Sequence, residues 1–98
     1  MMIPMKSGKA GKKAPGFFVY IVRCSDGTYY CGYTGNLESR IEAHNNGSGA
    51  KYTRTRGPVE LAYYEGKESR AEAMRRELEI KAMTRAGKEE IIREFEKK

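Results

Sequence analysis

The side chains of this sequence that are best suited to catalysis belong to two tyrosines, an arginine and a histidine. Tyr20 lies in an aromatic and β-branched stretch, Tyr30 follows ten residues later, and Arg40 and His44 are four residues apart. Four residues are about one helical turn, so a helix would place Arg40 and His44 on one face. Phenol, guanidinium and imidazole groups on one surface could activate a water molecule and hold a phosphate group.

Glu77 differs from the other acidic residues in its position on a predicted helix. At about 100° per residue, it falls within a broad apolar arc, whereas Glu72 and Glu79 lie on the opposite side. A carboxylate directed toward a core is costly unless a cation accompanies it. That cation could be Arg40, Arg76 or Mg²⁺, which one carboxylate, waters and a substrate phosphate can hold. The pattern alone leaves an ion pair and a metal site open. The arc consists of Ala71, Ala73, Met74, Leu78, Ile80 and Ala82.

Basic residues are concentrated in two segments of a chain whose formal net charge is +6. We interpret residues 1–15, which contain four lysines and no acid, as a disordered basic leader that contacts a polyanion or merely aids solubility. Residues 51–56 combine cations, hydroxyls and an aromatic ring, which suits phosphate contacts and base stacking, although a solvated loop is the alternative. The nucleic-acid-binding residues expected there are Lys51, Tyr52, Arg54 and Arg56.

Length and composition favour one small cytoplasmic domain, residues 16–98. The chain has 98 residues, of which 39% are hydrophobic and 33% charged, so its core must be thin. No apolar run approaches the roughly 20 residues of a membrane span, and the basic start lacks the apolar stretch of a secretory signal. Cys24 and Cys31 have no second Cys/His pair, which excludes a zinc site of known spacing.

The strands and helices predicted around these residues are those of an α+β domain. Aromatic and β-branched residues predict two strands around the turn Ser25-Asp26-Gly27, and Asn36 and Ser69 are suited to cap helices. The order β-β-α-β-α-α predicts a small three-stranded mixed or antiparallel sheet flanked by helices. The expected strands are residues 17–24, 28–33 and 59–65, and the expected helices are residues 37–45, 69–84 and 88–95, with a flexible loop at residues 45–49.

The reactive residues and their order along the chain resemble the motifs of the GIY-YIG nuclease superfamily. Its first triplet corresponds to Phe18-Val19-Tyr20 and its second to Tyr30-Cys31-Gly32, and Arg40, His44 and Glu77 follow at the family's spacing. Each triplet alone is weakly specific, whereas the ordered set of five elements is specific. The resemblance covers most of the chain and is nearest to the small single-domain YhbQ-like, or UPF0213, proteins. Phe18 replaces the first glycine of the family name.

The resemblance implies an endonuclease that hydrolyses phosphodiester bonds in DNA with one Mg²⁺ or Mn²⁺ ion, in DNA repair or recombination. Glu77 would hold the metal, and Gly32 and Asn36 would join the nucleic-acid contacts. The proton acceptor for the attacking water stays open between two tyrosines and the histidine. The implied catalytic residues are Tyr20, Tyr30, Arg40, His44 and Glu77.

A nucleic-acid-binding module with little or no catalytic activity is the main alternative. The basic leader and residues 51–56 would serve such a module equally well. Single-stranded, nicked, flapped and branched DNA are all possible ligands, and so is RNA. Larger GIY-YIG nucleases attach this domain to a second one that selects the DNA, so we expect either weak intrinsic specificity here or a protein partner that supplies it.

Overall fold

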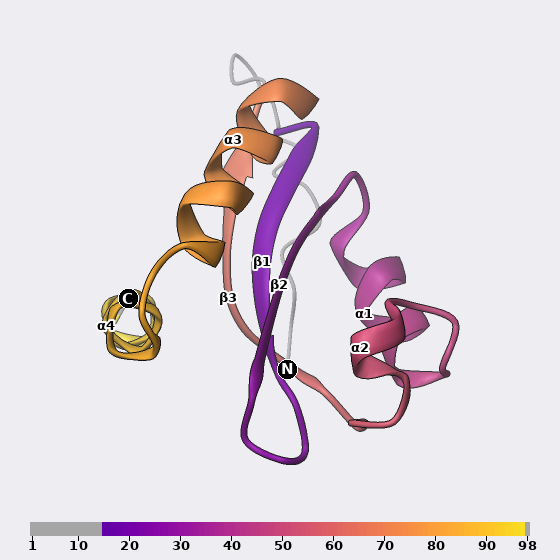
Figure 1. The fold of residues 1–98 in the computed structure, drawn as a ribbon. Helices are drawn as coiled ribbons and strands as arrows, with labels where there is room; N and C mark the ends of the chain where they lie inside the picture. The colour runs from indigo at the N-terminus through magenta and orange to yellow at the C-terminus, as the bar shows by residue number, and fades with distance from the viewer. Residues whose placement is uncertain (1–14, 98) are drawn as a thin grey trace.

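A three-stranded antiparallel sheet forms the centre of the molecule (Figure 1). The computed structural model describes residues 15–97, so the expected basic leader lies outside the described residues except for Pro15. β1 (Phe17–Arg23) is the middle strand, between β2 (Tyr29–Thr34) and β3 (Glu60–Lys67). The strand order β2-β1-β3 makes β2 an edge strand, one side of which has no pairing partner among residues 15–97.

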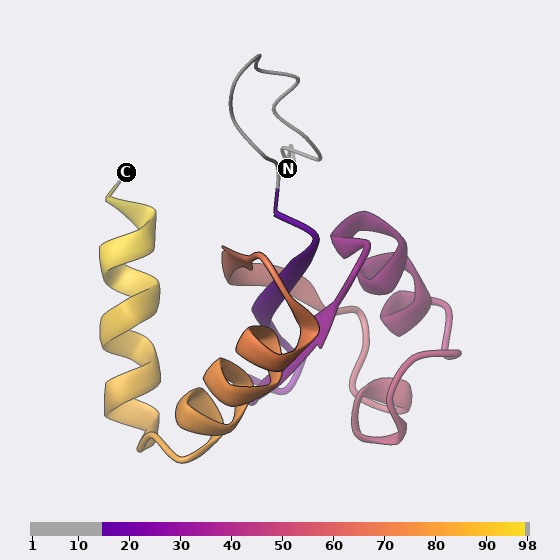
Figure 2. The same ribbon diagram turned by 90° about the horizontal axis from the view of Figure 1, so that it is seen from above.

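Helices flank the sheet on both faces (Figures 1 and 2). α1 (Leu37–Asn45) and the short α2 (Lys51–Arg54) lie on one face, and α3 (Arg70–Lys81) lies on the other. α4 (Arg85–Glu96) packs beside β3 on the α3 side. The α+β class and the flanked three-stranded sheet are therefore confirmed. No helix within the described residues is long and apolar enough to cross a membrane.

Side chains of β1 alternate between two hydrophobic clusters, as expected for a strand that is covered on both faces. Phe18, Tyr20 and Val22 contribute to the cluster on the α1 side, and Val19 and Ile21 to the cluster on the α3 side. Packing on both faces therefore fixes the position of Tyr20. Partners on the α1 side include Leu37, Val59 and Leu61, and partners on the α3 side include Ala73, Ile80 and Ile92.

Local hydrogen bonds explain where the elements begin. The hairpin turn is as expected, with Gly27 at φ 87° and Asp26 accepting a bond from the Thr28 amide. Asn36 accepts a bond from the Ser39 amide and caps α1. The helix expected to reach about residue 84 ends at Lys81 instead, because Thr84 caps the next helix.

The short helix α2 lies where the sequence predicted only a basic loop. Its single turn is held by a bond of 3.2 Å from the Thr53 amide to the Ala50 carbonyl. Four residues are too few for a hydrophobic period to be recognised, which is why no helix was predicted there. The turn directs Thr53 into the interior, where its side chain is fully buried.

Candidate active site

Tyr20 reaches the open edge of the sheet by passing over Gly32. The two residues are paired in neighbouring strands, and the Tyr20 side chain is only 1% exposed. A Cβ atom at Gly32 would lie 2.5 Å from the Tyr20 phenol oxygen. Any side chain at this position would therefore displace the phenol, so glycine is required here by close approach. Gly32 thus gives Tyr20 the room it needs, and the expected contact of Gly32 with nucleic acid stays a prediction.

A buried polar cluster surrounds the Tyr20 hydroxyl. His44 Nε2 lies 2.9 Å from the phenol oxygen, and Arg40 Nε donates a hydrogen bond to the same oxygen at 3.4 Å. α1 brings Arg40 and His44 there from consecutive turns. The structure thus joins three of the five implied catalytic residues in one hydrogen-bonded group.

His44 has a second partner that the sequence analysis assigned to a different role. Its Nδ1 lies 2.7 Å from the hydroxyl oxygen of Thr53, and both side chains are buried. Gly49 packs against the imidazole, since a Cβ atom there would come within 2.7 Å of Nδ1. The sequence placed Thr53 among groups that contact phosphate, and no periodic signal marked it as a partner of His44.

Tyr30 borders the cluster without a hydrogen bond to it. Its ring lies edge-on to His44, with centroids 5.3 Å apart, and stacks on Tyr52 at 5.8 Å. Within residues 15–97, the Tyr30 hydroxyl has no hydrogen-bond partner, and its side chain is half-buried. The hydroxyl is therefore able to meet a substrate or a water molecule.

The four expected nucleic-acid-binding residues of the α2 segment do not behave alike. Lys51, Tyr52 and Arg54 are exposed. Arg56 forms an ion pair with Asp26 at 3.2 Å and lies over the Tyr52 ring, with its guanidinium carbon 4.0 Å from the centroid. Arg56 therefore holds Tyr52 in place, and Lys51 and Arg54 are the better candidates for phosphate contacts.

Asn36, the remaining expected contact, is exposed at the start of α1. Its side-chain oxygen accepts the Ser39 amide bond that caps the helix. This cap accounts for the residue type, because Asn is among the preferred N-cap residues. Contact with nucleic acid through its amide group stays a prediction.

Glu77 lies on the other face of the same edge strand. Its backbone carbonyl is 4.0 Å from the Cys31 sulfur, and Cys31 directly precedes Gly32 in β2. The side chain is 16% exposed, and its carboxylate is paired with Lys81 at 3.5 Å. Lys81 is thus its partner in this structure, in place of the arginines considered from the sequence.

The apolar arc that singled out Glu77 is narrower than the sequence indicated. Ala73 and Ile80 are fully buried against the sheet, whereas Met74 is 44% and Leu78 is 65% exposed. The sheet meets a strip of α3 in which Glu77 lies between Ala73 and Ile80, one turn from each. Glu77 consequently emerges at the edge of a buried contact, which is why its carboxylate is mostly covered.

Burial sets the protonation states of the cluster. It raises the pKa of Tyr20 to about 12, against the opposing effect of the hydrogen bond and charge of Arg40. Burial, followed by the charge of Arg40, lowers the pKa of His44. A neighbouring arginine favours the phenolate, but for Tyr20 desolvation outweighs this effect. At neutral pH the pair consists of a phenol and an uncharged imidazole.

The residues present fit one hydrated divalent ion and not a metal site built wholly from protein ligands. No three His, Cys, Asp or Glu side chains gather around a common point among residues 15–97. Mg²⁺ commonly keeps several waters and uses one or two carboxylates together with substrate phosphates. Glu77 supplies one such carboxylate, and its partner Lys81 is 48% exposed and free to move aside.

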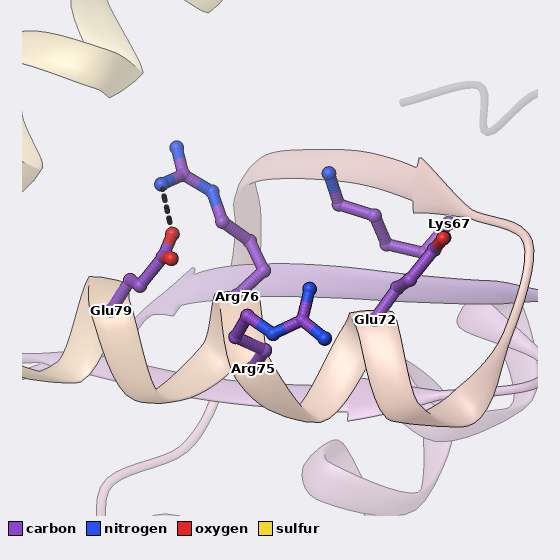
Figure 3. Close-up of a pocket in the computed structure, with 5 residues that line it drawn as sticks. All are labelled: Lys67, Glu72, Arg75, Arg76 and Glu79. Carbon is purple, nitrogen blue, oxygen red and sulfur yellow. Dashed lines mark hydrogen bonds and ion pairs between the residues drawn. The ribbon is translucent and has the colours of Figure 1, made fainter.

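A cleft beside α3 has charged walls, and three of its lining side chains form ion pairs (Figure 3). It is lined by Lys67, Glu72, Arg75, Arg76 and Glu79. Arg76 binds Glu79 at 3.0 Å and Glu65 at 3.1 Å, and Lys67 also binds Glu65. Lys67 belongs to β3, the edge strand opposite to β2. The cleft therefore does not extend the candidate site.

Comparison with known proteins agrees with the ordered motifs. Residues 16–90 match the family described as GIY-YIG catalytic domain. A UPF0213 protein from Staphylococcus aureus strain Mu3 is 53% identical over 77 residues, which make up 79% of this chain and 94% of that relative. The S. aureus strain N315 has a UPF0213 protein with the same identity and coverage.

Two solution NMR structures share the fold. A UPF0213 protein from Bacillus halodurans is 46% identical, with a TM-score of 0.51 over 78% of this chain and 81% of that one. A protein from E. faecalis is 39% identical, with a TM-score of 0.56 over 89% of this chain and 91% of that one. The chain therefore belongs to the GIY-YIG family, within its group of small UPF0213 proteins, and has the catalytic domain of a nuclease.

Proposed function

We propose that the protein is a Mg²⁺- or Mn²⁺-dependent endonuclease that hydrolyses phosphodiester bonds in DNA, and that it acts in the cytoplasm in DNA repair or recombination. The observation that carries the proposal is the arrangement around β2. The Arg40–Tyr20–His44 cluster lies on one side of this open edge strand at Gly32, and Glu77 lies on the other side beside Cys31.

Each group has a role that its surroundings support. Arg40 uses Nε for Tyr20, which leaves its terminal nitrogens for a phosphate whose negative charge grows during the reaction. Glu77 would hold the divalent ion, which withdraws charge from the phosphate and the leaving oxygen when bound. His44, as an uncharged imidazole, can accept a proton that originates from the attacking water.

Exposed cations beside the cluster favour a polyanionic substrate. Lys51 and Arg54 project from α2, the helix that also supplies Thr53 to His44. Phosphate contacts from such side chains position a nucleic acid without reading its sequence. Specificity for one DNA structure is therefore proposed to come from a protein partner.

Incubation with a panel of labelled substrates tests the proposal. The panel contains single-stranded, nicked, flapped and branched DNA and a matched single-stranded RNA, each with Mg²⁺, with Mn²⁺ and with chelator. We expect cleavage of at least one DNA with metal and none with chelator. Metal-independent cleavage would overturn the metal assignment, and cleavage of RNA alone would overturn the substrate.

A binding module without activity is the second candidate, and the Glu77–Lys81 ion pair favours it. This pair already neutralises the carboxylate that a metal ion would need. Tight, salt-sensitive binding of the whole panel without any product, at every metal tested, would support this candidate over the nuclease.

A further inference from the structure

The hydroxyl group of Thr53 has one proton and two close polar neighbours. Its oxygen lies 3.1 Å from the Ala50 carbonyl oxygen and 2.7 Å from His44 Nδ1. A carbonyl oxygen can only accept, so Thr53 donates its proton to Ala50. Toward His44, the Thr53 oxygen is then an acceptor, and His44 Nδ1 carries the hydrogen. The reverse assignment would put the hydrogen on Nε2 and leave the buried Tyr20 O–H without an acceptor among residues 15–97, since the Tyr20 oxygen already accepts from Arg40 Nε.

This assignment propagates through the buried cluster. An uncharged imidazole has one N–H, so a hydrogen on Nδ1 leaves Nε2 as an acceptor. The Tyr20 hydroxyl, 2.9 Å from Nε2, therefore donates to it, while the Tyr20 oxygen accepts from Arg40 Nε. Along the chain of hydrogen bonds that leads from Arg40 Nε to the Ala50 carbonyl, each donor then has an acceptor, and all the bonds run in one direction.

Burial prevents the groups of this hydrogen-bonded network from exchanging their partners for water. Thr53 is 0% and His44 is 1% exposed, and Gly49 closes directly over the imidazole. A buried donor or acceptor that loses its partner cannot turn to solvent, so the network has little freedom to reorganise.

We propose that Thr53 is a positioning residue that fixes the His44 tautomer and thereby makes Tyr20 a proton relay between the attacking water and His44 Nε2. The relay rests on the proposed nuclease function, whereas the tautomer does not. In the step, the water oxygen bonds to phosphorus as its proton passes to the Tyr20 oxygen, and the Tyr20 proton passes to Nε2. The bond from phosphorus to the leaving oxygen breaks, and that oxygen takes the electron pair and a proton from solvent. His44 then returns its proton to solvent.

The opposite tautomer would disable this route. A hydrogen on Nε2 would point at the Tyr20 oxygen, and no nitrogen would be available to receive the Tyr20 proton. In the serine protease triad, the wrong histidine tautomer similarly removes most of the activity although the geometry is kept.

The tautomer can be measured directly because His44 is the single histidine of the chain. A long-range ¹H–¹⁵N spectrum of the uniformly labelled wild-type protein at neutral pH contains one imidazole. We expect its Nδ1 to be protonated and its Nε2 to be the bare, acceptor nitrogen. A spectrum with the hydrogen on Nε2 would overturn the proposal, whatever the activity of the protein.

Three threonine variants link the tautomer to the reaction. Thr53→Val keeps the shape and removes the hydroxyl, so the tautomer should shift toward Nε2–H and kcat should fall by about tenfold or more with KM little changed. Thr53→Ser restores the hydroxyl and should recover both properties. Thr84→Val removes an exposed hydroxyl at the start of α4, away from the cluster, and should change neither.

The outcomes separate this proposal from the proposed function. A Thr53→Val protein that keeps wild-type kinetics would overturn the relay, and so would a Thr53→Ser protein that behaves like Thr53→Val. Should Thr53→Val fail to fold, the wild-type spectrum and the Thr53→Ser kinetics decide the question. If the wild-type protein cuts no substrate but has the Nδ1–H tautomer, the nuclease function fails while the positioning role of Thr53 stands.

Discussion

Tyr20 and Tyr30 come from neighbouring strands, but their hydroxyl groups lie in different environments. The Tyr20 oxygen is buried between Arg40 and His44, whereas the Tyr30 hydroxyl has no partner among residues 15–97. Removing the hydroxyl group of Tyr20 should therefore have other consequences than removing that of Tyr30. At the scale of single residues, stability and activity can be separated by comparing the two.

Tyr20→Phe should be the more damaging of the two changes. It leaves buried groups of Arg40 and His44 without a partner, which costs about 1–3 kcal/mol of unfolding free energy. It also removes the relay, so kcat should fall by about 10²-fold or more. Tyr30→Phe should leave stability unchanged and lower cleavage only through lost substrate contact. Urea denaturation and single-turnover cleavage measure both, and a fully active Tyr20→Phe protein would contradict the relay.

Glu77→Gln should abolish metal-dependent cleavage while the fold and DNA binding are kept. The lost ion pair with Lys81 is 3.5 Å long and half exposed on the lysine side, so the stability change should stay below about 1 kcal/mol. Cleavage should fall by about 10²-fold or more, since the proposed metal ligand is gone. Glu79→Gln, which breaks a pair with Arg76, is the matched control and should cut normally. Wild-type cleavage by Glu77→Gln would refute the metal assignment.

His44 makes stability depend on pH below neutrality. Its pKa in the folded protein lies below the ordinary value of 6.5, so the unfolded chain binds more protons in the window just below that value. Stability should therefore be complete above pH 6.5 and decline as pH falls toward the pKa of the folded state. Urea denaturation of the wild type and of His44→Gln at several pH values tests this expectation. The decline should be smaller in the variant, and equal slopes would contradict it.

At the scale of elements, β2 and the α1–α2 connection each contribute a glycine that lets a catalytic side chain approach. Gly32 lies under the Tyr20 phenol, and Gly49 lies against the His44 imidazole. These are contacts of backbone with side chain, so they depend on how a strand and a helix pack and not on turn geometry. The positions of the phenol and the imidazole are consequently set in part by two glycines, which carry no reactive group themselves.

Gly32→Ala should impair the protein through Tyr20. The added Cβ would lie 2.5 Å from the phenol oxygen, so the ring must shift away from Arg40 and His44. We expect a loss of about 1–3 kcal/mol and a strong decrease in cleavage. Gly35→Ala, where the nearest atom is 3.7 Å away, is the control and should be nearly silent. Thermal melting and cleavage assays read out both effects, and a Gly32→Ala protein with normal activity would show that the close approach is dispensable.

At the scale of the whole molecule, two exposed positive charges lie beside the site. The formal net charge is +6, and exposed Lys51 and Arg54 lie on the helix that supports His44. The ion pair of Arg56 with Asp26 removes that arginine from the set of free cations. The exposed cations and the Arg40–Tyr20–His44 cluster therefore lie on the same side of the sheet, the α1–α2 side, next to the open edge of β2.

The double variant Lys51→Gln/Arg54→Gln should weaken DNA binding and reduce its salt dependence. If both side chains contact phosphates, the slope of log K against log salt should fall by about two for double-stranded DNA, about one per lost contact. Lys97→Gln on the distant α4 removes one exposed charge and should change the slope little. Fluorescence anisotropy over a salt series measures the slopes. An unchanged slope in the double variant would place the phosphate contacts elsewhere.

Features that depend on neighbours within one turn or one hairpin could be predicted from the sequence. The turn at Asp26-Gly27, the cap at Asn36 and the spacing of Arg40 and His44 involve residues close in the chain, where periodicity and backbone preference decide the structure. The α+β order follows from the same local patterns. The short helix α2 was missed because one turn has no period to detect.

Which of these residues contact one another could not be predicted from the sequence, because the contacts depend on tertiary packing. Tyr20 and His44 are 24 residues apart, and Cys31 and Glu77 are 46 apart, so their contacts depend on how the helices pack on the sheet. The same packing buries the phenol deeply enough that desolvation outweighs the charge of Arg40 and raises its pKa. The same packing brings Thr53 against His44. No spacing in the sequence encodes this contact, because many side chains could have been the partner of His44.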